Sequence, residues 1–181
     1  MRSNVLGITL ALSIFGSLFA ASDDIQVVEL TRDGWVYVSL TFTNGFTDDM
    51  RAALRSGLPT AITYEIELRR EMPVWFDQTL MRVTVTASAQ YDNLTRQHQL
   101  SRTIDGRGEE PVFARDEEVV RQWLTSLERL KLFKTTPVLE PNVEYYIQVR
   151  AHSKPRTGWF FFWPFDRGTA AGSARFTFIP S

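Results

Sequence analysis

The chain contains no cysteine, and its 181 residues include only two histidines. Without thiols it has no disulfides, no thiolate zinc site, no iron–sulfur cluster and no cysteine nucleophile. It also lacks an excess of charge of either sign, because 20 basic residues are matched by 21 acidic ones and the formal net charge is -1. Proteins that bind nucleic acid usually carry clustered basic side chains that contact phosphates. We therefore expect no thiolate metal site and no nucleic-acid partner.

Sequence patterns of common catalytic sites are missing as well. His98 and His152 are 54 positions apart, so they do not form the paired spacing that places two metal ligands on one face of a helix. The chain has no Gly-x-Ser-x-Gly elbow, no glycine-rich phosphate loop and no Ser-x-x-Lys element. We expect a protein that is not an enzyme and has no cofactor or metal. The alternative is a glycosidase-like hydrolase that uses paired carboxylates such as Asp48/Asp49 or Glu109/Glu110.

The N-terminal residues have the pattern of a secretory signal peptide. Arg2 is the only charge before Asp23, and the apolar run 5–21 ends in small residues. This run is shorter than the roughly 20 apolar residues that a membrane-spanning helix needs. We predict a signal peptide at residues 1–21 with cleavage near Ala20 to Ser22, and one mature domain at residues 22–181. The alternative is an uncleaved N-terminal anchor, and in both cases the domain would be exported to the periplasm or cell envelope of a bacterium.

Alternation of apolar and polar residues dominates the rest of the chain, and it indicates half-buried β-strands. The Asp33-Gly34 dipeptide is typical of a hairpin turn, and Tyr91-Asp92-Asn93 offers a second turn. Strands are expected at seven places: 25–30, 36–42, 62–69, 81–89, 95–103, 145–151 and 174–178.

Two segments have helical patterns instead. Thr47-Asp48-Asp49 can cap a short helix over 50–55 that stops at Gly57. Residues 117–132 predict an amphipathic helix of about sixteen residues, because apolar side chains recur at spacings of three and four from Val119 to Leu130. We expect Trp123, Leu124 and Leu127 to pack on the protein's own sheet.

Seven short strands with only two helices favour antiparallel pairing, because parallel strands need a crossover helix after most strands. The predicted fold class is therefore mainly β: an immunoglobulin-like antiparallel β-sandwich of about seven strands with one amphipathic helix and one short helix. We found no linker that would divide the chain, and we expect residues 105–111 to form a mobile loop.

The segment 158–165 is the most unusual part of the sequence, with six aromatic residues in eight positions. One interpretation is an apolar loop that covers one end of the core. The other is an exposed interaction site flanked by cations, which would contact an envelope protein or an anionic membrane surface. The candidate interaction residues are Trp159, Phe160, Phe161, Phe162, Trp163, Phe165, Lys154, Arg156 and Arg167.

Several segments together resemble an uncharacterised family of bacterial exported β-rich proteins, a domain of unknown function. The resemblance rests on Tyr64-Glu65-Ile66-Glu67-Leu68-Arg69-Arg70, Trp75-Phe76-Asp77, Tyr91-Asp92-Asn93-Leu94-Thr95, Leu139, Tyr145-Tyr146-Ile147-Gln148-Val149-Arg150 and the Leu-rich segment 117–132. It implies a bacterial envelope protein with a β-rich fold, and it supplies no catalytic residue, cofactor or substrate. We expect a non-catalytic binding or structural module of the envelope, with a membrane-surface-associated accessory protein or the hydrolase above as the alternatives.

Overall fold

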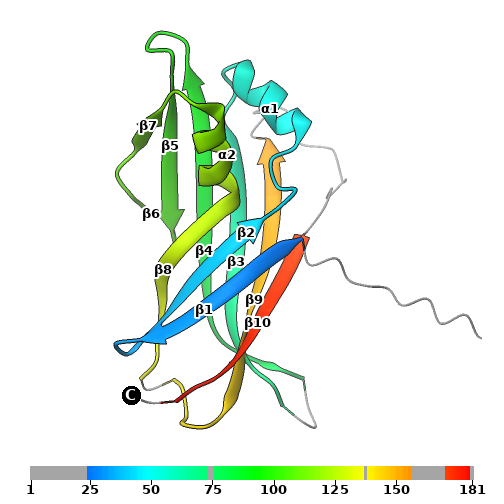
Figure 1. Cartoon of the computed structure of the whole chain (residues 1–181), viewed down its shortest axis with the longest axis vertical. Coiled ribbons are helices and arrows are strands. Elements are labelled where there is room, and N and C mark those ends of the chain that lie inside the picture. Colours follow the sequence, from blue (N-terminus) through cyan, green and yellow to red (C-terminus); the bar gives the residue numbers. More distant parts are fainter. Residues whose placement is uncertain (1–23, 73–75, 137, 156–169, 180–181) are drawn as a thin grey trace, which may run out of the picture.

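The computed structural model describes residues 24–72, 76–136, 138–155 and 170–179. The described chain forms ten strands and two helices (Figure 1). In chain order they are β1 (Ile25–Arg32), β2 (Trp35–Phe42), α1 (Asp48–Arg55), β3 (Thr60–Arg70), β4 (Gln78–Asp92), β5 (Gln97–Ile104), β6 (Arg107–Gly108), β7 (Val112–Ala114), α2 (Glu117–Thr125), β8 (Ser126–Lys134), β9 (Glu144–Pro155) and β10 (Ala170–Thr177).

The larger of the two sheets has seven strands in the order β10-β9-β3-β4-β5-β6, with β7 also paired to β5. Its central strand β3 confirms the predicted alternation. One face of β3 is fully buried and carries Ile62, Tyr64, Ile66 and Leu68. The Tyr64 hydroxyl donates a hydrogen bond of 2.7 Å to the Leu124 carbonyl, which fixes α2 above this face.

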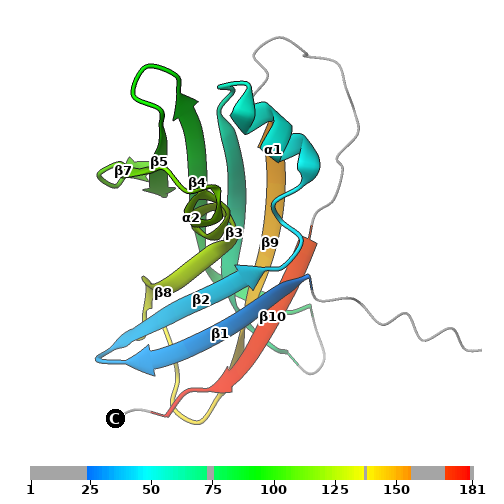
Figure 2. The same cartoon turned by 45° about the horizontal axis from the view of Figure 1, so that its top comes forward.

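The smaller sheet has the order β1-β2-β8 and crosses obliquely over the lower part of the same buried face (Figures 1 and 2). The helices α1 and α2 cover the upper part of that face. The core lies between these layers, and it includes Val36, Val38 and Leu40 from β2. All strand pairs are antiparallel, so the predicted antiparallel β-sandwich is confirmed.

The first predicted turn and the short helix are confirmed, whereas the second turn lies at residues 93–96, after Tyr91 and Asp92 at the end of β4. Asp33 and Gly34 adopt φ values of 51° and 75°, the left-handed geometry that a two-residue hairpin turn needs. The Thr47 side chain accepts a hydrogen bond of 3.3 Å from the Met50 amide and caps α1. Gly57, with φ of 74°, follows the helix.

The prediction of one long helix over 117–132 was wrong in its second half. The helix α2 ends at Thr125, and residues 126–134 form strand β8 along β2. Leu124 on the helix and Leu127 on the strand are both buried, and Trp123 packs partly buried against the core. The expected core contacts are therefore present, but Leu127 contributes to them from a strand.

Two irregularities in β8 explain the misleading helical spacing. Between Val38 and Leu40 the strand β2 advances two residues, whereas β8 advances three, from Leu130 to Leu127. A second bulge lies opposite Val36 and Tyr37. Each bulge adds a residue and resets the alternation, so inward side chains on β8 are no longer two positions apart.

The number of strands was also underestimated, because ten are present in the described residues and seven were predicted. The strands β6 and β7 have two and three residues, too few for an alternation to be recognised. Asp105 and Gly106, with φ of 48° and 78°, form a tight turn that pairs β6 with β5. The segment 105–111 is therefore partly a hairpin rather than only a loop.

Candidate interaction surface

The aromatic segment predicted from the sequence lies outside the described residues. This holds for Trp159, Phe160, Phe161, Phe162, Trp163, Phe165, Arg156 and Arg167. Lys154 lies near the end of β9, where its backbone is in register with Ala61 of β3. The interaction role of these residues stays a prediction.

The carboxylate pairs considered for a hydrolase are on different elements. Asp48 and Asp49 lie in the first turn of α1, where Asp48 accepts a hydrogen bond of 2.5 Å from Arg51. Glu109 and Glu110 are exposed between β6 and β7. An open concavity beside the β5–β6 turn is lined by Asp105, Arg107 and Glu109 among others. The Asp105 carboxylate already accepts a hydrogen bond of 2.8 Å from the Thr84 amide. The hydrolase alternative stays a prediction.

The two histidines face opposite sides of the large sheet. His98 on β5 is buried beside the Tyr91 ring, with 4.9 Å between the ring centroids, and burial lowers the pKa of its imidazole. His152 on β9 is on the outer face, 3.9 Å from a Glu65 carboxylate oxygen. In the ranges that the structure describes, no three residues of the types His, Asp or Glu group as metal ligands would.

The outer face of the large sheet is polar, and its charged side chains bind one another. Glu67 is almost fully buried on this face, and Arg82 donates two hydrogen bonds to its carboxylate. Arg69 donates a hydrogen bond of 2.7 Å to the Gln148 side chain. Most of these charges are therefore paired within the face, although the buried Arg69 Nε makes no hydrogen bond among the described residues and lies 3.9 Å from a Glu67 carboxylate oxygen.

One end of this network is a short hydrogen bond of 2.5 Å from the Tyr146 hydroxyl to Asp77. This bond is the main reason why the pKa of the Asp77 carboxyl is lowered. Burial, and then the bond to Asp77, raise the pKa of Tyr146 to about 12. At neutral pH the ionised Asp77 carboxylate therefore accepts a hydrogen bond from the protonated Tyr146 hydroxyl. This bond links β9 to the residue just before β4.

The outer face of the small sheet has a different composition. The strand register places Leu30 beside Tyr37, and Tyr37 beside Lys131. Arg32, Trp35 and Lys134 form the next row toward the hairpin turn. In the row Leu30, Tyr37 and Lys131 the side chains change from aliphatic on β1, through aromatic on β2, to cationic on β8, whereas the row nearer the turn begins with the cation Arg32.

The polarity of β1 is inverted along the part nearest the hairpin turn. Val28 and Leu30 point outward and are 64% and 49% exposed, whereas Glu29 and Thr31 point toward the core. Burial raises the pKa of Glu29, and the buried Thr31 hydroxyl has no hydrogen-bond partner among the described residues. A shift of one residue would reverse this orientation, but the Asp33-Gly34 turn fixes the register.

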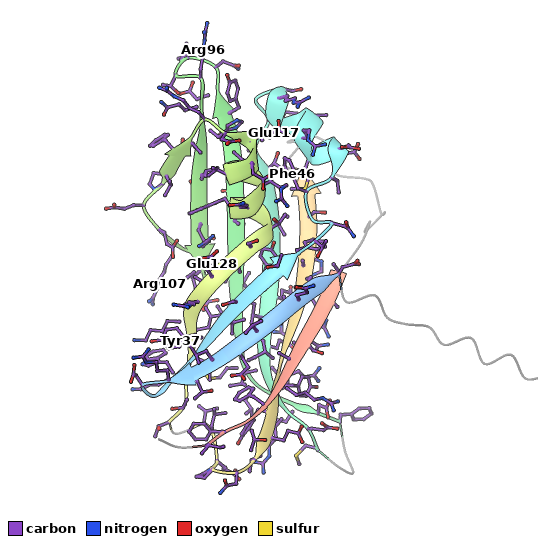
Figure 3. The ribbon with its side chains drawn as sticks, viewed as in Figure 1. Tyr37, Phe46, Arg96, Arg107, Glu117 and Glu128 are labelled. Atoms are coloured by element: carbon purple, nitrogen blue, oxygen red, sulfur yellow. The ribbon has the colours of Figure 1, made fainter. Side chains whose placement is uncertain are left out.

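Four cations line the small sheet, although the chain as a whole is nearly neutral. The Lys131 ammonium lies 4.3 Å from the centroid of the Trp35 ring. Arg32, Arg129 and Lys134 are exposed nearby, and the acids at the margin are Asp33, which pairs with Arg32 at 3.2 Å, and Glu128. Figure 3 shows Tyr37 near the hairpin end of the sheet and Glu128 nearer to α2.

We call the outward side chains Val28, Leu30, Arg32, Trp35, Tyr37, Arg129, Lys131 and Lys134 the small-sheet face. The sequence patterns did not lead us to this face, although the first hairpin contains an indication of it. Both alternating sets of the first hairpin contain apolar residues, for example Val36 and Val38 on one side and Trp35 and Tyr37 on the other. The helix predicted over 117–132 did not place Arg129 and Lys131 beside β2, where strand β8 brings them.

The fold and this face together define an antiparallel β-sandwich with one polar, internally paired face and one apolar, cationic face. The chain belongs to the family described as Domain of unknown function (DUF4390), whose model matches residues 21–156. This match confirms the resemblance to a domain-of-unknown-function family. Neither the curated proteins nor the solved structures gave a match. Neither described helix is long and apolar enough to cross a bilayer.

Proposed function

We propose that this protein is an exported, non-catalytic binding module of the bacterial envelope, and that the small-sheet face is its binding surface. The inverted polarity of β1 is the observation that carries this proposal. Turning Val28 and Leu30 outward leaves apolar area in water, while turning Glu29 inward costs part of its hydration. The turn fixes the orientation of β1, but apolar residues at its outward positions do not favour folding, whereas a partner that covers the face would recover their apolar area.

The contrast between the two outer faces supports the same surface. An outer sheet face that stays in water is usually polar, as the large sheet's outer face is. The small sheet instead carries aliphatic and aromatic side chains side by side, with cations at their edge. Apolar patches with a charged rim are typical of interaction sites, and Trp, Tyr and Arg are enriched there.

The proposed location rests on the N-terminal sequence. The apolar run 5–21 after Arg2 ends in small residues directly before the polar start of the domain. The absence of disulfides does not argue against a location in the envelope, because a 160-residue domain can bury a sufficient hydrophobic core without cross-links. The aromatic segment 159–165 would be a second contact in this role.

The absence of cysteine makes a direct test practical. A single Leu30→Cys substitution provides the only thiol in the chain, and Gln99→Cys on the exposed outer face of β5 is the matched control. We expect a membrane-impermeant maleimide to label position 30 slowly in isolated envelopes and rapidly in the purified protein. Position 99 should label rapidly in both preparations. Equal labelling of both positions in envelopes would contradict a role for the small-sheet face.

A further inference from the structure

We infer that the partner of the small-sheet face is the surface of an anionic phospholipid bilayer. This inference rests on the proposed function, since it names what covers the same face. It depends on described side chains alone and does not involve the aromatic segment 159–165.

The row Leu30, Tyr37 and Lys131 across the three strands matches the depth profile of a lipid leaflet. Val28 and Leu30 on β1 are aliphatic, Trp35 and Tyr37 on β2 are aromatic, and Lys131 and Lys134 on β8 are cationic, while the cation Arg32 lies at the end of β1 next to the hairpin turn. Aliphatic groups are favoured near the acyl chains, and Trp and Tyr are favoured at the headgroup level. Lysine and arginine side chains extend toward lipid phosphates. A tilt of the face that lowers β1 relative to β8 would place these three classes at suitable depths.

The dimensions of the sheet are consistent with this placement. Neighbouring strands are about 4.8 Å apart, so β1 and β8 are separated by roughly 10 Å across the sheet. Amphipathic elements at a bilayer surface insert by roughly 5 to 10 Å into the boundary between headgroups and acyl chains. The face therefore fits the interfacial region, and no strand has to enter the centre of the bilayer.

Charge complementarity favours an anionic surface over a second copy of the chain. The exposed charged residues of the small sheet and its hairpin turn are four cations, Arg32, Arg129, Lys131 and Lys134, and two acids, Asp33 and Glu128. Two such faces in a symmetric dimer would place cations against cations or against the aliphatic strip of β1. An anionic bilayer instead offers phosphates to the cations and apolar volume to Val28 and Leu30.

The experiment places an environment-sensitive fluorophore on the Leu30→Cys thiol of the full chain purified from envelopes. The same fluorophore on Gln99→Cys is the control for position. Vesicles of phosphatidylglycerol and phosphatidylcholine are compared with vesicles of phosphatidylcholine alone, and the access of an aqueous quencher to the label is measured. Site-specific protection reports which face meets the lipid, whether or not the N-terminal segment is retained.

We expect protection at position 30 on the anionic vesicles only, with the label at position 99 still open to the quencher. Replacing Lys131 and Lys134 by Gln should reduce membrane partitioning through this face about 25-fold, since each basic side chain near an anionic surface contributes roughly fivefold. The pair Arg96→Gln and Arg115→Gln changes the net charge equally at exposed sites outside the small sheet and should have little effect. Raising the salt concentration to about 1 M should also remove the protection, because charges are then screened beyond about 3 Å.

Three results would overturn the lipid assignment. Equal quenching at positions 30 and 99 on anionic vesicles would show that this face does not meet lipid. Protection of position 30 in purified protein without vesicles would indicate a second copy of the chain. Protection in native envelopes but not on vesicles would indicate a protein or glycan partner, and in that case the proposed binding role of the face would still stand.

Discussion

Gly172 of β10 and Ile25 of β1 approach so closely that a β-carbon on Gly172 would lie 2.0 Å from the Ile25 carbonyl oxygen. The two sheets of the sandwich meet at this contact. Because the nearest atoms belong to the Ile25 backbone rather than to a flexible side chain, a larger residue at position 172 would have to separate the strands. Gly172 is therefore required by packing rather than by a special backbone conformation.

We predict that Gly172→Ala lowers the free energy of unfolding by about 2 kcal/mol or more, since overpacking typically costs about 1 to 3 kcal/mol and the backbone here cannot yield locally. The matched control is Gly108→Ala, because a β-carbon on Gly108 meets no atom within 4 Å. Denaturant unfolding of both variants checks this contact. Equal stability of the two variants would mean that β1 and β10 are farther apart than described.

Leu127 should behave as a core residue although it lies on a strand. It is only 1% exposed and pairs with Leu40 across the small sheet. Leu127→Ala should destabilise the protein by about 2 to 5 kcal/mol, because the truncation removes apolar contacts and leaves a cavity. Leu94→Ala, at a turn where Leu94 is 95% exposed, should change stability by less than about 0.5 kcal/mol. A loss below about 0.5 kcal/mol for Leu127→Ala would place its side chain outside the core.

Most of the sheet could be predicted from sequence because local patterns were sufficient there. The alternation from Ile62 to Leu68 fixed a strand and its buried face, and Asp33-Gly34 fixed a hairpin and its register. The segment 126–134 could not be predicted in this way. Its helical spacing results from two bulges, and its strand conformation depends on pairing with β2, which lies about 90 residues earlier in the chain.

The small-sheet face required the same long-range information. Trp35 and Lys131 are 96 positions apart in the sequence, and only the pairing of β2 with β8 brings the ammonium over the indole. The sequence did contain the apolar residues on both sides of the first hairpin. Which side would meet the core was settled by the larger sheet, because β2 has to present Val36, Val38 and Leu40 to it.

The inward Glu29 predicts a measurable dependence of stability on pH. Its pKa is raised in the folded protein by burial. The folded state therefore holds this proton more tightly than the unfolded state, so stability from this group is present below pH 4.5 and is lost as pH rises through the raised pKa. Glu29→Gln should stabilise the protein modestly at pH 7 and change its stability little at pH 4. Unfolding curves at the two pH values check this, and an equal effect at both would contradict it.

The N-terminal sequence predicts a mature protein that begins near Ser22. Removal of residues 1–21 takes away only Arg2, so the mature chain has 19 basic and 21 acidic residues and a formal net charge of -2. The intact mass of the protein from fractionated cells checks the cleavage. A mass that includes residues 1–21 would indicate an anchored domain, and recovery from the cytoplasm would contradict export.

The central claim is that the outward Val28 and Leu30 side chains contribute to binding and not to the stability of the fold. It is tested most directly by measuring the free energy of unfolding and the retention by envelopes of one variant. The double variant Val28→Thr and Leu30→Thr puts a β-branched residue at both positions of the strand but removes apolar surface. We expect its free energy of unfolding to stay within about 0.5 kcal/mol of the original, as for other exposed positions, while its retention by isolated envelopes falls sharply. A loss of more than about 1 kcal/mol of stability, or unchanged retention by envelopes, would contradict the claim.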